Sequence, residues 1–178
     1  MTNYELRNVS RRSLPRGEMF LFDLVEKRWD QIEIGVQDDL SAQIQAVAIC
    51  SASLHLPPFE LSFKSNLQED IQQISPLLAK QFRQLLEWGE SNLVTPVNFP
   101  EFPDFQSRYW VRSSAPESTQ RFFDERMARY FANIEYYSLR AAGDLFVFAE
   151  NELGYTNDQA LMTRRINRAL EIYRLFQK

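Results

Sequence analysis

The side chains that most often perform chemistry are scarce in this chain. His55 is its one histidine and Cys50 its one cysteine. A single histidine leaves a Ser-His-Asp triad one possible base and excludes paired histidine metal ligands, and a single cysteine excludes an internal disulfide or a cysteine-rich zinc site. Cys50 lies in the apolar run QAVAICSAS and His55 in LHLPPF. We therefore expect a buried, inert thiol and a packed or turn histidine.

Carboxylates are the remaining material for a reactive site. Asp38-Asp39 and Glu69-Asp70 are adjacent pairs of the kind that serve acid–base catalysis or bind divalent cations. Both lie in polar connecting segments, where solvated loops are the expected structure. The chain has five glycines and lacks the G-x-S-x-G, P-loop and G-x-G-x-x-G motifs. We therefore predict no catalytic, cofactor-binding or metal-binding residue, and we expect no cofactor.

Composition is typical of one globular domain, except for its aromatic residues. The chain has 178 residues, of which 14 are Phe, 7 Tyr and 3 Trp. Large rings bury much surface per residue, so they predict an aromatic core; a ring-lined ligand cavity is the alternative. The residues after Met1 do not form a signal peptide, and MFLF and AVAIC are too short to span a bilayer. With one cysteine, this suggests a cytoplasmic protein.

Charge is unevenly distributed along the chain. The net charge is −4, yet residues 1–16 contain four Arg and one Glu, and residues 164–178 contain four Arg, one Lys and one Glu. The acidic middle argues against nucleic-acid binding. The basic ends would suit an acidic protein partner or peripheral contact with an anionic membrane. Alternatively, Arg164, Arg165, Arg168 and Arg174 face water and favour a helix C-terminus.

The first third of the chain predicts strands. Residues 1–16 have no clear period and suggest a loosely ordered segment, extended near YELRNV, followed by a turn. EMFLFDLVEKRW, QIEIGV and PPFELSF have strand composition or alternation, and AQIQAVAICSAS is a strand with a helix as the alternative. The spacing of Ile71, Ile74, Leu78, Phe82 and Leu85 then predicts a helix that begins near Ser75, before Pro76.

The rest of the chain predicts a crossing segment, a strand, two helices and a hairpin. Pro96, Pro100 and Pro103 predict an extended crossing over residues 89–106, followed by the strand RYWVR. Two helices are predicted from capping boxes, at Ser114 with Glu117 and at Thr156 with Gln159. Between them, Gly143-Asp144 predicts a type II′ turn that places Leu139 opposite Phe148 and Arg140 opposite Val147.

This order predicts an α+β fold with a mainly antiparallel sheet and about three helices. The elements follow one another as β-β-β-β-α-β-α-β-β-α, in a single domain over residues 1–178. Sequence pattern does not give the order of the strands in the sheet or the oligomeric state.

Four stretches carry a resemblance to a known group of proteins. They are LHLPPFEL, FPEFPDFQSRYWV, RFFDERM and IEYYSLRAAGDLFVF, within residues 44–176. Together they resemble a family of uncharacterised bacterial proteins with a Leu-Pro-x-Phe strand entry, a Phe-rich extended stretch and a C-terminal helix-hairpin-helix. This chain has Ser138 near the position where that family usually has a glycine. The resemblance implies no activity, although some members of the family look membrane-tethered.

These observations favour a non-enzymatic protein-interaction or scaffold domain. The alternatives are a small-ligand binding domain with an aromatic-lined cavity and a carboxylate-dependent enzyme. Candidate partner-binding residues are of two kinds, the outward arginines of the last helix and the rings of the crossing segment: Arg164, Arg168, Arg174, Phe99, Phe102 and Phe105. For the last helix, we expect Met162, Ile166, Ala169 and Tyr173 to pack on the sheet.

Overall fold

The computed structural model describes residues 3–27, 43–64, 95–134, 137–150 and 158–177. Within these ranges the strands are β1 (Asn3–Leu14), β2 (Gly17–Lys27), β3 (Gln43–Ser51), β4 (Leu56–Phe63), β5 (Thr95–Pro96), β6 (Tyr109–Ser113), β7 (Tyr137–Gly143) and β8 (Leu145–Glu150). The helices are α3 (Pro103–Arg108), α4 (Pro116–Phe122), α5 (Glu125–Ala132) and α6 (Gln159–Phe176).

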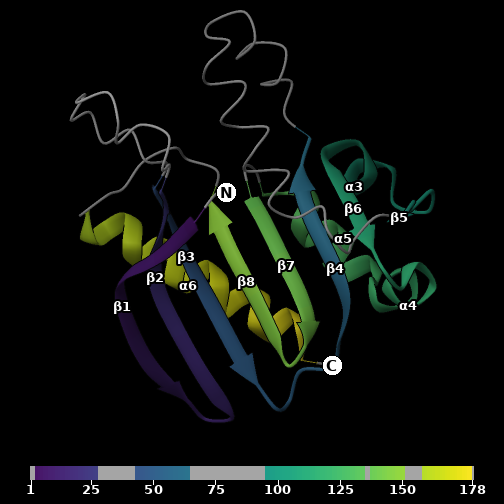
Figure 1. Cartoon of the computed structure of the whole chain (residues 1–178). Helices are drawn as coiled ribbons and strands as arrows, with labels where there is room; N and C mark the ends of the chain where they lie inside the picture. The colour runs from purple at the N-terminus through teal and green to yellow at the C-terminus, as the bar shows by residue number, and fades with distance from the viewer. Residues whose placement is uncertain (1–2, 28–42, 65–94, 135–136, 151–157, 178) are drawn as a thin grey trace, which may run out of the picture.

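The strands form one antiparallel sheet in the order β1-β2-β3-β8-β7-β4-β6-β5. The β7–β8 hairpin inserts between β3 and β4, so strands that are neighbours in sequence are separated in the sheet. In Figure 1, α6 crosses behind the middle of the sheet, and α3, α4 and α5 lie beside β4 and β6. The fold is therefore α+β with a mainly antiparallel sheet, as the sequence predicts.

Alternation along each strand sends one set of side chains toward the helices, and we call that side the covered face. One row of it runs across five strands and contains Met19, Ile49, Phe146, Ala141 and Phe59; each of these residues is at most 6% exposed. The next row contains Leu21, Val47, Phe148, Leu139, Leu61 and Val111. The other side of the sheet is here called the open face.

Ring contacts join the strands of the covered face to the helices and the helices to one another. Phe59 lies 5.2 Å from Phe123 and 6.1 Å from Phe176, measured between ring centroids. Phe105 lies 5.4 Å from Phe123 and 5.3 Å from Phe99. The Phe105–Phe123 pair is stacked and the other three are edge-on, and both arrangements are favourable at these separations. The aromatic content of the described residues is thus largely accounted for by a packed core.

Two polar groups hold α6 to the sheet at separate points along its length. Near its start, Arg165 reaches Glu150 on β8; near its end, the Tyr173 hydroxyl lies 2.9 Å from the Ser51 hydroxyl on β3. Between and beyond them, Ala169, Ile172 and Phe176 are buried against the core. Of the four α6 residues predicted to pack on the sheet, Ala169 and Tyr173 are buried there, which confirms the prediction for them. Met162 and Ile166 are partly buried at the margin of the core.

The predicted β7–β8 hairpin is confirmed in its register. Leu139 pairs with Phe148 and Arg140 with Val147. Gly143 has φ +61°, the left-handed region that L-residues resist, and Asp144 does not share it. This combination fits type II′ and excludes type I′, which needs a positive φ at both central residues.

Both predicted capping boxes are wrong, and one predicted helix is two. α4 has Ala115 at its N-cap with no side-chain cap, and its chain leaves the helix at Phe123. Asp124 then caps α5, because its Oδ1 accepts a hydrogen bond from the Met127 amide at 2.8 Å. Asp158 caps α6 in the same way through Ala160. An aspartate at N-cap accepts such bonds as well as serine or threonine does.

Other segments differ from expectation or fall outside the described residues. Residues Asn3–Leu14 form a full strand paired with β2, and not a loosely ordered segment. Inside the predicted crossing, Pro103 begins the short helix α3, consistent with the preference of proline for a first helical turn. The predicted strand QIEIGV and the predicted helix from Ser75 lie outside the described residues, as do the two carboxylate pairs.

Candidate binding surface

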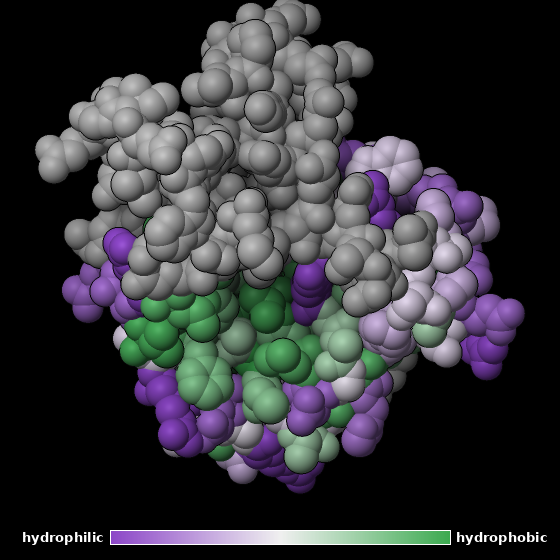
Figure 2. Space-filling view, viewed as in Figure 1, coloured by the Kyte–Doolittle hydropathy of each residue, from purple (hydrophilic) through white to green (hydrophobic). Residues whose placement is uncertain are grey.

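The open face has an apolar half over β2, β3 and β8. The alternation that buries the covered face places a second set of residues here: Phe20, Phe22, Leu24, Ile44, Ala46, Ala48, Val147 and Ala149. Leu24, Ala46 and Ala48 are buried, and the other five are partly exposed. One row pairs Phe20 with Ala48 and Ala48 with Val147, and Leu145 is 41% exposed at the hairpin end. Figure 2 shows part of this half as green area below the grey atoms on the viewer's side of the molecule. We call these residues, with Leu145, the apolar patch.

Charged and polar side chains continue the same rows over β7, β4 and β6. Arg140 pairs with Val147 on one side and with Glu60 on the other, and its guanidinium lies 3.3 Å from the Glu60 carboxylate. Ser62 donates a hydrogen bond to Glu60 at 3.0 Å. Trp110 is 56% exposed, with the Lys64 ammonium 4.1 Å from its ring centroid, and partial burial lowers the pKa of Lys64. The apolar patch therefore has one sharply polar border.

Helix contacts of the described residues go to the covered face. α6 contacts β3 and β8, and α4 contacts β4 and β6, through residues such as Ile172, Phe123 and Thr119 that point into the core. In Figure 1, α6 lies behind the strands while the open face is turned to the viewer. Within the described ranges, no helix packs on the apolar patch.

The β1 strand forms the edge of the sheet next to this patch. Its residues from Leu6 to Ser13 are all exposed, including Leu6 at 59% and Val9 at 56%. The pairing with β2 shifts between Arg7 and Ser10, which is a β-bulge. Asn8 in the bulge has φ 51°, a conformation that Asn tolerates better than most residues, and its side-chain amide donates to Asp23 at 2.6 Å. The bulge is thus fixed by a specific contact.

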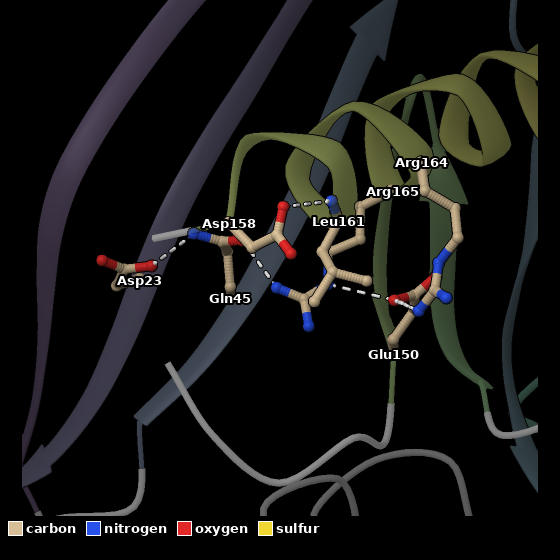
Figure 3. Close-up of polar contacts among 7 residues, drawn as sticks. All are labelled: Asp23, Gln45, Glu150, Asp158, Leu161, Arg164 and Arg165. Atoms are coloured by element: carbon tan, nitrogen blue, oxygen red, sulfur yellow. Dashed lines mark hydrogen bonds and ion pairs between the residues drawn. The ribbon is translucent and has the colours of Figure 1, made fainter. Parts of the chain in front are cut away.

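A buried polar network connects that bulge to α6 across the covered face. Asp23 accepts from Gln45 at 3.2 Å, and Gln45 accepts from Arg165 at 2.6 Å. Arg165 also donates to Glu150 at 3.1 Å, and both side chains are 3% exposed. Figure 3 shows these residues meeting beneath the first turns of α6.

The Glu150–Arg165 contact suits a structural role. Each buried charge faces a partner of opposite sign, which offsets the cost of removing it from water. The second oxygen of Glu150, Oε1, is buried without a hydrogen-bond partner among the described residues. No group of three or more potential metal ligands occurs within the described part of the chain. The network therefore orients α6 on the sheet and offers no assembled reactive centre.

The arginines predicted as an outward basic surface have different environments. Arg164 lies 3.0 Å from Glu150 with 40% of its side chain exposed, and Arg168 stacks 5.1 Å from the Tyr137 ring. Arg174 is exposed. Arg165, expected to face water, is buried, because Glu150 at the end of β8 supplies its counter-charge. Two of the three candidate residues are therefore engaged with the sheet.

The rings of the crossing segment belong to the core. Phe99 and Phe105 are each 1% exposed, and Phe102 packs against the core from its margin. Gln106 ties the segment down, because its side-chain oxygen accepts from the Phe99 amide at 2.6 Å. Phe99 and Phe105 are therefore enclosed in the core, while Phe102 is partly exposed at its margin.

The two residues singled out for chemistry lie near the surface. Cys50 is partly exposed on the open face, so the expectation of a buried thiol is wrong. Its Sγ lies 3.7 Å from an Asp144 carboxylate oxygen. Partial burial and the Asp144 charge raise the pKa of the Cys50 thiol, which keeps it protonated. His55 is exposed in the connection between β3 and β4, which agrees with a turn histidine.

A surface hollow lies between α3 and α5. It has a volume of about 720 Å³, and Phe102 and Phe105 contribute to its wall. The remaining lining is largely charged or small, including Asp104, Arg108 and Arg129. A hollow of this composition differs from the aromatic-lined cavity that the sequence left open.

The apolar patch was visible in the sequence only in part. EMFLFDLVEKRW is apolar on both faces, which indicated a doubly covered strand. Without the strand order, Phe20 and Phe22 on β2 could not be joined to Ala48 on β3 and Val147 on β8. All three strands carry apolar side chains on both faces of the sheet, and this shared feature of their sequences could have indicated the patch.

Comparison with family models, with curated proteins and with solved structures found no match to this chain. Among the described helices, none is long and apolar enough to cross a membrane.

Proposed function

We propose that this protein is a non-enzymatic domain that binds a protein partner through the open face of its sheet. The observation that carries the proposal is the apolar patch over β2, β3 and β8, on which no described helix packs. Contiguous apolar surface bordered by polar residues marks interaction sites on globular proteins. The Glu60–Arg140 pair and exposed Trp110 provide that border.

The remaining features of the described chain support binding over catalysis. Asp23 and Glu150 are the buried carboxylates, and both are engaged by Asn8, Gln45, Arg164 or Arg165 in contacts that fix the fold. Asp144 beside Cys50 disfavours the thiolate, the reactive form of a nucleophilic cysteine. The rings that could have lined a ligand cavity pack against one another instead.

Site-specific photocrosslinking in lysate of the source cells tests this function. A photoreactive residue replaces Val147 in the apolar patch or, as the control, exposed Asn167 on α6. We expect position 147 to crosslink one dominant protein that position 167 does not. Excess unlabelled parent protein should compete for it, and excess Val147→Lys variant should not, because a buried unpaired ammonium opposes apolar contact.

Two results would count against the proposal. One is the same set of weak crosslinks from both positions, and the other is competition by Val147→Lys equal to that of the parent. Circular dichroism and thermal unfolding of Val147→Lys establish that the variant is folded before it is used. A crosslink to a second copy of the chain alone would indicate self-association in place of a separate partner.

A further inference from the structure

We propose that the β1 edge of the sheet accepts an acidic extended segment of the partner protein as an additional antiparallel strand. This inference rests on the proposed function and adds to it the chemistry of the partner. A strand at a sheet edge presents unpaired backbone groups, and an extended peptide that adds to such an edge gains main-chain hydrogen bonds. Within the described ranges, β1 pairs with β2 and no strand pairs with its outer edge.

The part of β1 that suits strand addition follows the bulge. From Ser10 to Leu14 the pairing with β2 is regular, ending with Leu14 opposite Gly17 at a two-residue turn. The Asn8–Asp23 hydrogen bond holds the bulge where this stretch begins. A fixed edge loses little conformational freedom when a strand is added, which favours binding.

Charge determines which strand can bind there. Arg11 and Arg12 are exposed on opposite faces of β1, and Arg16 is exposed in the adjoining turn. Arg11 forms an ion pair with Glu18 of β2, which aligns its guanidinium along the open face. Opposite charges on neighbouring strands attract and like charges repel. A strand with carboxylates opposite Arg11 and Arg12 is therefore favoured on both faces.

The same charges disfavour a second copy of this chain as the occupant. An antiparallel β1–β1 pairing centred on Val9 would place Arg7 of each copy opposite Arg11 of the other. Basic side chains and bulges are devices by which edge strands avoid pairing with themselves. Here they also select the partner, because guanidinium groups that repel another copy attract carboxylates.

Exposed apolar side chains add a second requirement. Val9 and Leu6 precede the arginines and are more than half exposed. An antiparallel partner would place its acidic residues first and β-branched or aliphatic residues after them. Leu6 lies opposite Leu24, so contact with the added strand would be continuous with the apolar patch. The partner's extended segment and the body that covers the patch would then bind to one surface.

The test uses the whole protein and the fluorescein-labelled peptide Thr-Glu-Glu-Thr-Val-Thr-Thr-Ile-Thr, with fluorescence anisotropy as the readout. We expect saturable binding that weakens as salt rises, because exposed charges are screened. The same peptide with Lys in place of Glu should not bind. Arg11→Glu with Arg12→Glu should weaken binding about tenfold, the effect expected when two cross-strand attractions become repulsions. Arg121→Glu with Arg129→Glu, at exposed ion pairs on α4 and α5, is the matched control.

Backbone methylation separates strand addition from simple charge attraction. Two versions of the acidic peptide are methylated at alternate amides, so that one version loses the donors that face β1 and the other loses those that face away. We expect one version to lose binding and the other to keep it. Equal binding of both versions, or equal binding of the lysine peptide, would overturn the inference. So would a β1-dependent dimer in sedimentation without peptide binding.

A membrane is the remaining outcome of the test. Vesicles of phosphatidylcholine with one-third phosphatidylserine test this outcome. The inference would be overturned if the vesicles bind the parent protein and not the Arg11→Glu, Arg12→Glu variant, and the acidic peptide binds neither protein. Failure of this inference is distinguishable from failure of the proposed function. A specific crosslink from position 147 that persists in the Arg11→Glu, Arg12→Glu variant would retain the binding domain and exclude the β1 edge.

Discussion

The two faces of the sheet are built from alternate residues of the same strands, yet they differ in what completes them. On β8, Phe146 and Phe148 are at most 1% exposed under the helices, while Val147 between them lies on the open face. The covered face has both apolar packing and polar anchors for α6. The open face has apolar side chains with no described helix against them. The covered face is completed by helices of this chain, and we propose that the open face is completed by a partner protein.

The largest expected effect distinguishes the faces at adjacent positions. Phe146→Ala should lower the free energy of unfolding by about 3–5 kcal/mol, because it leaves a cavity in a packed core. Val147→Ala should lower it by about 1 kcal/mol or less, since the side chain is partly exposed. Urea unfolding of both variants measures the difference. Equal losses would mean that the open face is packed as tightly as the covered one.

The polar anchor of the covered face gives the next effect. Arg165→Met should destabilise the protein by about 3 kcal/mol, because Glu150 would lose its buried counter-charge and keep only the partly exposed Arg164. Replacing both residues, Arg165→Met with Glu150→Leu, should restore much of that loss, since neither charge then remains. Urea unfolding of the single and double variants checks this. A double variant as unstable as the single one would show that the network contributes more than charge neutralisation.

Sequence patterns predicted local structure well where one strand or hairpin determines it. Gly143-Asp144 identified the turn and its register because a positive φ is a local demand. The capping boxes failed because several residues near each helix start can serve as a cap, and Asp124 and Asp158 compete equally well. Arg165 was expected in water because its counter-charge, Glu150, lies on a different element. The apolar patch was missed because it depends on the order of strands.

Gly17 and Gly143 both resist substitution by a larger residue, but for different reasons: crowding at Gly17 and backbone conformation at Gly143. At Gly17, which lies opposite Ser51, an added Cβ would approach Ser51 Cα at 2.8 Å and the Cys50 carbonyl oxygen more closely still. At Gly143, nothing lies within 4 Å of the added Cβ, and φ +61° is the obstacle.

Gly17→Ala should therefore cost about 2–3 kcal/mol through crowding, and Gly143→Val about 1–2 kcal/mol through backbone strain. Asn tolerates the left-handed region, so Gly143→Asn should recover stability while Gly17→Asn should not. Asp144→Ala serves as the control for the turn and should be nearly neutral. Thermal unfolding distinguishes the two causes, and recovery of Gly17→Asn would contradict the crowding explanation.

The smallest effect concerns the reactivity of Cys50, at the margin of the open face. Because burial and Asp144 raise the pKa of its thiol, the thiolate fraction at neutral pH is below that of an ordinary cysteine. Native protein should thus react with a disulfide reagent more slowly than urea-unfolded protein, and the rate should rise with pH as the thiol ionises. Asp144→Asn removes the neighbouring charge, lowers the pKa and should increase the native rate several-fold. It should leave the unfolded rate unchanged, which provides the control. A native rate equal to the unfolded rate in the parent would show that neither burial nor charge protects this thiol.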